Sequence, residues 1–293
     1  MRKIFFISLF LFVLVSQNSY TQENNDSSFN FTIKESELLD FEFTGKPRVE
    51  ASYGFSQPKL KSLSQNFSQS GLLELRLGYA TQRNSAYRDD VFRFRDKYVF
   101  LSNTNSDFRT SSSVLTNIDA ESWKFGFGRT SGWGNRLGSG GIMPYVSNGF
   151  VWSRIDVKNN IPVPLSVQEQ ERINDFDNAL RFGTYTETGI RLQLYPMLTL
   201  RTAYQREIVF PRYLFWKHLG SYGVEAMGME IIYGFVREIM KSSPAAGPLM
   251  NVILKGGYSY ALYQLRAEKM NWPFTSSAPL VYDSFKFGMT FTF

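Results

Sequence analysis

The sequence predicts an all-β chain that closes into a transmembrane antiparallel barrel, and three observations lead to this class. The chain opens with an apolar leader of the kind that directs export. Beyond that leader, no stretch of about 20 apolar residues is available to span a membrane as a helix. The last ten residues alternate strictly between apolar and polar side chains. Because a chain without helical spans can cross a bilayer only as a closed barrel, we expect a barrel here.

Residues 1–22 have the three parts of a secretory signal peptide. Arg2 and Lys3 form the charged start, residues 4–15 are apolar apart from one serine, and the polar residues 16–22 form the cleavage region. The apolar run is shorter than the roughly 20 residues of a membrane-spanning helix. We therefore predict that this leader is removed rather than kept as an anchor.

The last strand, residues 284–293, carries the clearest signal in the chain. Its odd-numbered positions are all apolar and its even-numbered positions are polar or glycine, so the strand has one apolar face and one polar face. Ten such residues, tilted by about 45°, would nearly cross the roughly 25 Å apolar band of a membrane barrel. The apolar face consists of Phe285, Phe287, Met289, Phe291 and Phe293.

A leader followed by alternating strands and by a terminal aromatic strand that ends in Phe293 resembles the outer-membrane β-barrel proteins of Gram-negative bacteria. The resemblance implies that the apolar face of this last strand is the membrane-insertion signal for the barrel-assembly machinery. It also implies an outer-membrane location in contact with lipid and lipopolysaccharide, with both termini in the periplasm. The end of the leader, Tyr20, Thr21 and Gln22, is similar to leaders of Bacteroidota. The resemblance transfers no active site.

Similar alternation marks eight further strands upstream. They are expected at residues 48–55, 73–79, 92–100, 123–128, 146–152, 187–194, 198–205 and 252–262. In the third of these strands, Phe92, Phe94, Tyr98 and Phe100 are assigned to the lipid side. That assignment leaves Asp96 as a charged exception on the lipid side and turns the neighbouring cations inward.

Nine strands cannot be the full number, because single-chain bacterial barrels normally have an even number of strands. Short turns belong on the periplasmic side, and the tight turn at residues 195–197 then agrees with the order of the first seven strands. The missing strand must follow Ile208, at residues 210–219 or 229–236. We predict about ten strands, with eight and twelve as alternatives.

One helical segment is expected at about residues 221–241, before the last strands. Its apolar side chains recur every three to four residues, and Pro244 ends the pattern. The apolar face would be formed by Val224, Met227, Ile231, Phe235 and Ile239. Three glycines within the segment weaken a helix, so a strand or a mixed segment is the alternative.

The polar faces of the predicted strands should line the interior of the barrel, and their charges can be counted. The predicted interior charges are Glu50, Glu74, Arg76, Arg93, Arg95, Lys97, Lys124, Glu187, Arg191, Arg201, Lys255 and Lys286. Three are acids and nine are bases, so the predicted interior has a surplus of six positive charges. A small barrel is filled by its own side chains, so these cations need counter-charges.

Residues 23–47 form an acidic segment between the leader and the predicted barrel domain, residues 48–293. This segment contains Glu23, Asp26, Glu35, Glu37, Asp40 and Glu42. We expect the segment to lie in the periplasm and to offset the interior cations, with the carboxylates of the helical segment as an alternative source. A solvated tail, or a docking site for a partner, is the other interpretation of the same residues.

The amino-acid composition excludes several kinds of catalytic and metal-binding site. The chain has no cysteine and one histidine, so thiolate sites and multi-histidine metal sites are excluded, and we predict no metal and no cofactor. His218 has no serine or aspartate at a spacing typical of catalysis, and it lies beside Trp216 and Lys217. The basic and aromatic run 93–97 could suit nucleic acid, but an exported barrel rarely meets it. We therefore predict neither catalytic residues nor nucleic-acid binding.

These observations favour a non-enzymatic outer-membrane barrel that serves as an accessory subunit of an assembly, secretion or transport complex. Its partners would be other outer-membrane or periplasmic proteins. The main alternative is a small channel or carrier for anionic or amphiphilic solutes, because the predicted lining is cationic. A lipid-modifying enzyme built around His218 and a soluble periplasmic β-sandwich are the weaker alternatives.

Overall fold

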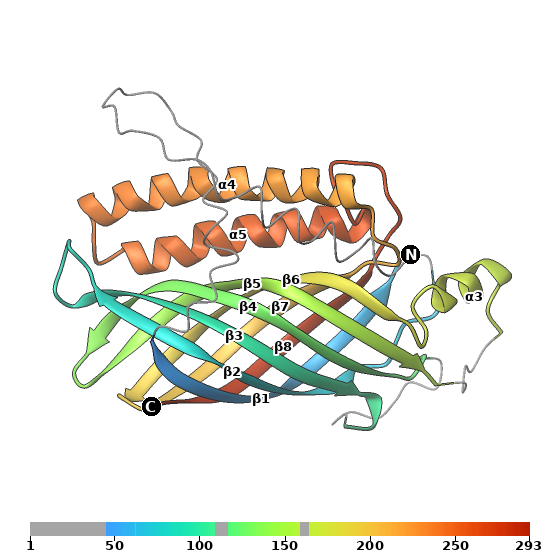
Figure 1. Cartoon of the computed structure of the whole chain (residues 1–293), viewed down its shortest axis with the longest axis horizontal. Helices are drawn as coiled ribbons and strands as arrows, with labels where there is room; N and C mark the ends of the chain where they lie inside the picture. The colour runs from blue at the N-terminus through green and yellow to red at the C-terminus, as the bar shows by residue number, and fades with distance from the viewer. Residues whose placement is uncertain (1–44, 62, 109–116, 159–163) are drawn as a thin grey trace, which may run out of the picture. The chain divides into compact units, whose positions relative to one another are not determined.

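The computed structural model describes residues 45–61, 63–108, 117–158 and 164–293. In this part of the chain, eight antiparallel strands follow one another around a closed barrel, and the last strand pairs with the first (Figure 1). The strands are β1 (Lys46–Leu60), β2 (Ser70–Asn84), β3 (Val91–Asn105), β4 (Ala120–Leu137), β5 (Gly140–Val157), β6 (Leu180–Tyr195), β7 (Leu198–Val209) and β8 (Leu280–Thr292).

The predicted barrel class is confirmed, and the predicted count of about ten strands is wrong. The first seven predicted strands fall within β1 to β7, and the last, 284–293, falls within β8 apart from Phe293. The segment 252–262 is helical, and both candidates for a tenth strand, 210–219 and 229–236, fall partly or wholly in a helix. The structure therefore has the eight strands of the lower alternative.

The two ends of the barrel differ in their connections. Short turns join β2 to β3, β4 to β5, and β6 to β7, and we call this side the short-turn end. Gly138 has a φ of 59° in the second of these turns, a conformation that glycine adopts without strain. The other side, the long-loop end, carries the η2 turn (Ser106–Phe108), the helix α3 (Val167–Asn174) and the insertion between β7 and β8. β1 begins and β8 ends at the short-turn end.

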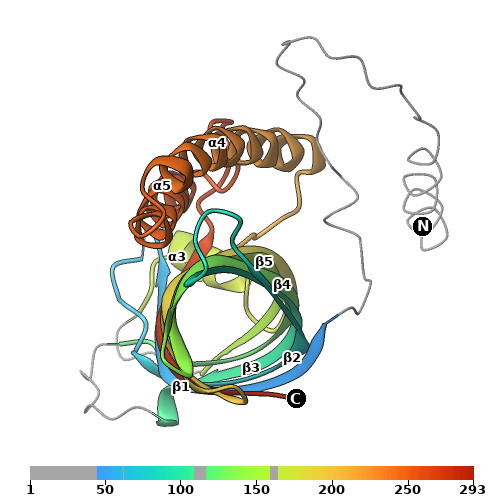
Figure 2. The same ribbon diagram turned by 90° about the vertical axis from the view of Figure 1, so that its left-hand side faces the viewer.

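The insertion between β7 and β8 forms two long antiparallel helices, α4 (Phe215–Ser242) and α5 (Gly247–Glu268). The predicted helix at 221–241 lies within α4. Figure 2 looks along the barrel and shows both helices outside the ring of strands. Gly256 of α5 lies against Thr188 of β6, and Tyr263 packs with Ile208 of β7, so the helices cover part of the outer wall. None of the helices in the described ranges combines the length and the apolar character needed to cross a membrane.

The prediction of a strand at 252–262 failed because the buried face of α5 is mixed, with small and polar residues beside Leu262 and Tyr263. Its buried positions include Asn251, Ser259, Leu262 and Arg266, which recur at helical spacing. The apolar residues of this segment instead alternate along the sequence, which is the pattern of a strand. The sequence of α5 therefore does have a helical period at its buried positions. Small and polar residues carry much of it, and a search for apolar periodicity does not count them.

Glycines on β4 make room for large rings inside the barrel. A Cβ atom at Gly128 would lie 2.0 Å from the Tyr185 hydroxyl, and one at Gly132 would lie 2.6 Å from the Phe94 ring. On β3, the aromatic residues stand directly opposite these glycines in the strand register. The pairs are Phe92 with Gly134, Phe94 with Gly132, Tyr98 with Gly128 and Phe100 with Gly126.

Candidate functional site: a charged network inside the barrel

The interior of the barrel consists of layers of buried side chains. An aromatic layer closes the short-turn end and is formed by Phe92, Phe94, Met143, Tyr145 and Ala203. A larger apolar layer closes the long-loop end and is formed by Leu60, Phe67, Ile118, Ala120, Ile155, Val157, Ile173, Phe176, Val209, Leu280 and Tyr282. Between the two layers lies a network of charged side chains.

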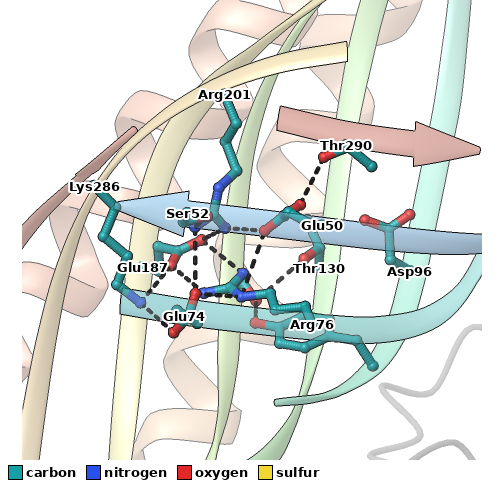
Figure 3. Close-up of polar contacts among 12 residues, drawn as sticks. Glu50, Ser52, Glu74, Arg76, Asp96, Thr130, Glu187, Arg201, Lys286 and Thr290 are labelled. Atoms are coloured by element: carbon teal, nitrogen blue, oxygen red, sulfur yellow. Dashed lines mark hydrogen bonds and ion pairs between the residues drawn. The ribbon is translucent and has the colours of Figure 1, made fainter. Parts of the chain in front are cut away.

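Glu187 of β6 is one of the central carboxylates of this network (Figure 3). Its Oε2 accepts a hydrogen bond from Nη2 of Arg76 at 2.6 Å. Its Oε1 accepts hydrogen bonds from Nη1 of Arg201 and from the Tyr145 hydroxyl, both at 2.8 Å. Nζ of Lys286 lies 3.5 Å from Oε2. Glu187 therefore joins side chains from four other strands.

Glu74 and Glu50 extend the network across the barrel. Arg76 donates from Nε to Glu74 at 2.7 Å, and Lys286 donates to the same carboxylate at 2.6 Å. Nη1 of Arg201 lies 2.9 Å from Oε1 of Glu50. Each guanidinium thus bridges two or three carboxylates, an arrangement that suits its planar fork of donors.

Asp96 points into the barrel from β3, and it is ion-paired with both Arg48 and Arg191. Arg48 is also paired with Glu50, which accepts a hydrogen bond from the Thr290 hydroxyl at 2.8 Å. The pairs formed by Asp96 therefore connect β3 to β1 and β6 and are continuous with the rest of the network.

A separate pair lies toward the long-loop end. Nζ of Lys124 is 3.1 Å from Glu207 and 3.1 Å from the centre of the Tyr282 ring. The ring face and the carboxylate together replace the water that the ammonium group loses on burial.

The interior charge is nearly balanced. Among the described residues, the buried charged side chains at inward-facing strand positions are five acids and six bases, which leaves one positive charge. They are Glu50, Glu74, Asp96, Glu187 and Glu207, and Arg48, Arg76, Lys124, Arg191, Arg201 and Lys286. A paired network of this kind fills space and fixes the positions of all eight strands relative to one another.

Eight of the twelve predicted interior residues lie in this network. They are Glu50, Glu74, Arg76, Lys124, Glu187, Arg191, Arg201 and Lys286. The structure places the other four elsewhere. Lys255 belongs to α5, and Arg93, Arg95 and Lys97 face the outside of the barrel, where Arg93 stacks on Tyr233 of α4. Prediction missed Arg48, Asp96 and Glu207.

The error on β3 has a physical reason. Sequence reasoning assigned the aromatic face of this strand to lipid, whereas the glycines of β4 leave space that only large inward side chains can fill. With Phe94 and Tyr98 inside, Asp96 must also point inward and Lys97 outward. The signal was present in the sequence as four glycines at alternating positions of the next strand. They are Gly126, Gly128, Gly132 and Gly134.

The charge balance removes the main reason for an acidic plug. Carboxylates of the barrel itself pair with the interior cations. The helix α4, which carries the alternative carboxylates, lies outside the ring of strands (Figure 2). Residues 23–44 of the predicted acidic segment, like the leader, are outside the described residues. A role for that segment therefore stays a prediction with less support than the residue counts suggested.

The last strand presents its aromatic face outward. Phe285, Phe287, Met289 and Phe291 of β8 are between 40% and 51% exposed, and Phe293 follows the strand with 67% exposure. The polar residues between them point inward, as Lys286 and Thr290 show by their contacts with Glu74 and Glu50. The barrel-assembly machinery would bind a membrane-insertion signal on this outward face.

His218 packs among aromatic rings at the start of α4. Its imidazole lies 5.1 Å from the ring of Phe210, 5.4 Å from that of Tyr213 and 5.8 Å from that of Phe182, measured between ring centres. Within the described ranges, no group of three or more residues of the types that bind metals comes together. The arrangement around His218 is that of a packed side chain.

At the long-loop end, Glu169 ties α3 to the connection between β1 and β2. Its carboxylate accepts hydrogen bonds from the backbone N–H of Ser64 at 2.6 Å and of Ser166 at 2.9 Å. Hydrogen bonds to the charged form lower the pKa of Glu169 to about 2. Ser166 is also the N-cap of α3, so one carboxylate serves both the helix and the neighbouring loop.

We expect Glu169→Gln to loosen this link, because an amide accepts these bonds more weakly than a carboxylate. Amide hydrogen exchange at Ser64 and Ser166 should become faster, whereas the exposed neighbour substitution Glu171→Gln should leave it unchanged. Because the folded pKa is depressed, the link should be complete above about pH 4.5 and lost as the pH falls toward 2. Equal exchange in the two variants would contradict the assigned role.

No protein-family model and no curated protein matches the sequence. Solved structures similar to the chain include Neisserial surface protein A, with 10% identity, a TM-score of 0.41, and coverage of 84% of this chain and 97% of that chain. They also include Ail of Yersinia pestis, with 8% identity, a TM-score of 0.32 and coverage of 85% and 99%. A third is OprG of Pseudomonas aeruginosa, with 10% identity, a TM-score of 0.29 and coverage of 85% and 96%. These likenesses add no argument to the barrel assignment, which rests on the strand pairing of this chain.

Proposed function

We propose that this chain is a non-enzymatic outer-membrane barrel whose interior is closed. It works through its outer surfaces, as an accessory subunit of an outer-membrane assembly, secretion or transport complex. The observation that carries the proposal is the filled interior, in which ion-paired side chains lie between two apolar layers. A barrel with a filled interior has its loops, rims and outer wall left for function.

The outer wall supports a membrane location. Outward-facing apolar side chains are exposed on all eight strands and form a surface that water would not favour. Examples are Tyr53, Leu73, Leu75, Leu77, Val99, Leu101, Trp123, Phe125, Ile190, Leu192, Phe285 and Phe287. The short turns and both ends of the barrel chain lie on one side, and we assign that side to the periplasm by the usual topology of such barrels.

The test is fractionation of cells that express the tagged full chain, followed by purification in mild detergent. We expect the protein in the outer-membrane fraction, together with a second chain at fixed stoichiometry. Recovery in the soluble periplasm would contradict the membrane assignment. Recovery in the outer membrane without a stoichiometric partner would contradict the role as a subunit.

Deletion of residues 291–293 should keep the protein out of the outer membrane, because it removes the aromatic end that we propose as the insertion signal. The measurement is the amount of protein in the outer-membrane and periplasmic fractions, compared with a Thr292→Ser variant that keeps both phenylalanines. Normal outer-membrane levels of the truncated chain would show that the signal lies elsewhere.

A further inference from the structure

The α4–α5 hairpin runs along the outer wall for the full height of the barrel. At the long-loop end, His218 near the start of α4 packs on Phe182, which lies where β6 begins. At the short-turn end, Val236 and Met240 pack with Val91, the first residue of β3. Figure 1 shows both helices lying lengthwise over the strands. The hairpin therefore reaches from one rim of the barrel to the other, so the medium around the wall also surrounds the hairpin.

Where the hairpin covers the wall, outward side chains of the barrel are polar. The helix α5 lies over β4 to β7, and its Gly256 stands against Thr188 of β6. The outward residues Thr184 and Thr186 of the same strand are 6% and 5% exposed. Beyond Thr188, the next outward residue is Ile190, which is apolar and 46% exposed. Along one strand, the outward residues are thus polar under the helix and apolar in the open, as expected of a wall that faces lipid.

The side of α5 that faces away from the barrel is uncharged over the height of a membrane. From Leu249 to Leu265, a stretch that the structure describes throughout, no exposed residue carries a charge. At the rise of an α-helix this stretch is about 24 Å long, close to the roughly 25 Å apolar band of an outer-membrane barrel. Leu249, Ile253, Tyr260 and Leu265 are between 43% and 58% exposed. A helix whose outer side met water would carry charged residues there.

The helix α4 continues this apolar surface. Met227, Ile231 and Phe235 are 47%, 67% and 60% exposed, and they form one stripe because they recur every four residues. One exposed residue beside them is an acid, Glu230, and its charge acts on Lys255 of α5. Ionisable residues inside a membrane usually occur in such opposite-charge combinations. The outer side of α4 is thus apolar apart from one acid that has a cation near it.

Charged residues mark both ends of the hairpin. At its tip, Glu238 and Lys241 are exposed and ion-paired at 2.8 Å. At its base, Glu268 is ion-paired at 3.2 Å with Lys61, which follows β1. Trp216, also at the base, is 78% exposed. Tryptophan is enriched where a membrane meets water, and charges lie outside the apolar band. The uncharged part of the hairpin therefore lies between two polar rims.

The exposed side of the hairpin is continuous with the apolar wall of the barrel. The ring of Tyr260 lies 6.2 Å from that of Tyr204 on β7, measured between ring centres. Tyr204 stands opposite Phe285 of β8, which belongs to the outward aromatic face of the last strand. Toward the long-loop end, the outward charges of Arg206 and Asp283 are paired with each other at 2.6 Å. One apolar surface thus passes from the last strand over β7 to the helix.

We propose that the outer side of the α4–α5 hairpin is embedded in the lipid of the outer membrane and contacts its acyl chains. This inference rests on the proposed outer-membrane location. The barrel takes the polar side of each helix, so only the outer side has to be apolar. The lipid-facing surface of the protein then consists of the open strand wall and of the helices that cover its polar part. The helical residues in contact with lipid are Met227, Ile231, Phe235, Leu249, Ile253, Tyr260 and Leu265.

The test places one fluorescent bimane label at a time on the full chain, which has no cysteine of its own. Ile253→Cys carries the label on the proposed lipid-facing side, and Leu75→Cys carries it on the open wall of β2. Glu238→Cys at the tip is the matched control in water. Each variant is reconstituted in phosphatidylcholine vesicles with brominated acyl chains, which quench a label that touches them. We expect equal quenching at residues 253 and 75, and far less at residue 238.

Quenching at residue 75 but not at residue 253 would overturn the inference, because the hairpin would then lie outside the lipid beside an inserted barrel. If Ile253→Cys does not fold, Ile231→Cys decides the question on α4 in the same way. Absence of quenching at every position would contradict the proposed membrane location, and the inference with it. A protein on this side is the remaining outcome: a photoreactive group at residue 253 in isolated outer membranes would then join a second chain, whereas contact with lipid predicts no protein adduct.

Discussion

Replacing Glu187 by leucine is expected to destabilise the barrel by about 3 to 5 kcal/mol, the cost of removing one partner from a buried ion-paired group. Glu187 is fully buried and contacts Arg76, Arg201 and Lys286. Without its carboxylate, these cations stay in a low-dielectric interior with fewer counter-charges. The loss should appear as a lower free energy of unfolding in urea, measured with the protein in detergent micelles or lipid vesicles.

The control for this experiment is Glu171→Leu on the exposed surface of α3, which should change the free energy of unfolding by less than about 0.5 kcal/mol. Glu187→Gln should fall between the two, because it keeps the shape and the hydrogen-bonding capacity but removes the charge. A Glu187→Leu barrel as stable as the control would mean that the network does not hold the strands together.

Two substitutions at neighbouring positions of β3 should change the stability of the protein by very different amounts. Asp96→Leu should lower the free energy of unfolding by about 3 to 5 kcal/mol, because Arg48 and Arg191 then stay buried inside the barrel without this counter-charge. Lys97→Leu should cost much less, since Lys97 lies on the outer wall and takes no part in the buried interior network. Urea unfolding of both variants under the same conditions measures the difference.

This pair tests the facing of β3 directly. If the aromatic side of β3 faced lipid, Asp96→Leu would remove a charge from lipid and stabilise the protein, and Lys97→Leu would be the damaging change. The reverse order of stabilities would therefore contradict the structure. Equal effects would place neither residue in the interior network.

Period-two alternation predicted β1, β2, β4 to β7 and β8, because a membrane barrel imposes opposite environments on successive residues. It also predicted β3, but it assigned the two faces of that strand the wrong way round, because both faces carry bulky or charged side chains. Phe94 and Tyr98 are inside because Gly132 and Gly128 of the next strand leave room for them. Which face of a strand points into the barrel thus depends on the space that the neighbouring strand leaves for its side chains. The sequence of one strand by itself does not contain that information.

The α4–α5 hairpin shows a second limit. The first helix was predicted from its apolar period, whereas the second was taken for a strand, because its buried face carries residues such as Asn251 and Ser259. Those side chains are buried against the polar outer wall of the barrel, where Thr184 and Thr186 are also covered. Burial between two polar surfaces leaves no hydrophobic pattern in the sequence.

The interior site was predictable in part. Residues with opposite charges on the polar faces of clean strands, such as Glu74, Arg76 and Glu187, could be assigned inward from alternation alone. The ion pairs that these residues form could not be predicted, because they depend on the register of each strand against its neighbours and on the stagger of the strands around the barrel. Four of the six surplus charges came from the cations of β3 and α5, which lie outside the interior instead. The missed residues Asp96, Glu207 and Arg48 lower the surplus by one more charge, to the single positive charge of the structure.

The central claim is that the interior of the barrel is closed, and single-channel recording tests it most directly. The purified full chain, reconstituted in a planar lipid bilayer, should give no steady conductance, because the apolar layers and the paired charges leave no continuous aqueous path. A variant with Phe92, Phe94 and Tyr98 all replaced by alanine should serve as a control for insertion, with conductance above the unaltered protein. A stable, ohmic and anion-selective conductance from the unaltered chain would contradict the claim and would identify the protein as a channel.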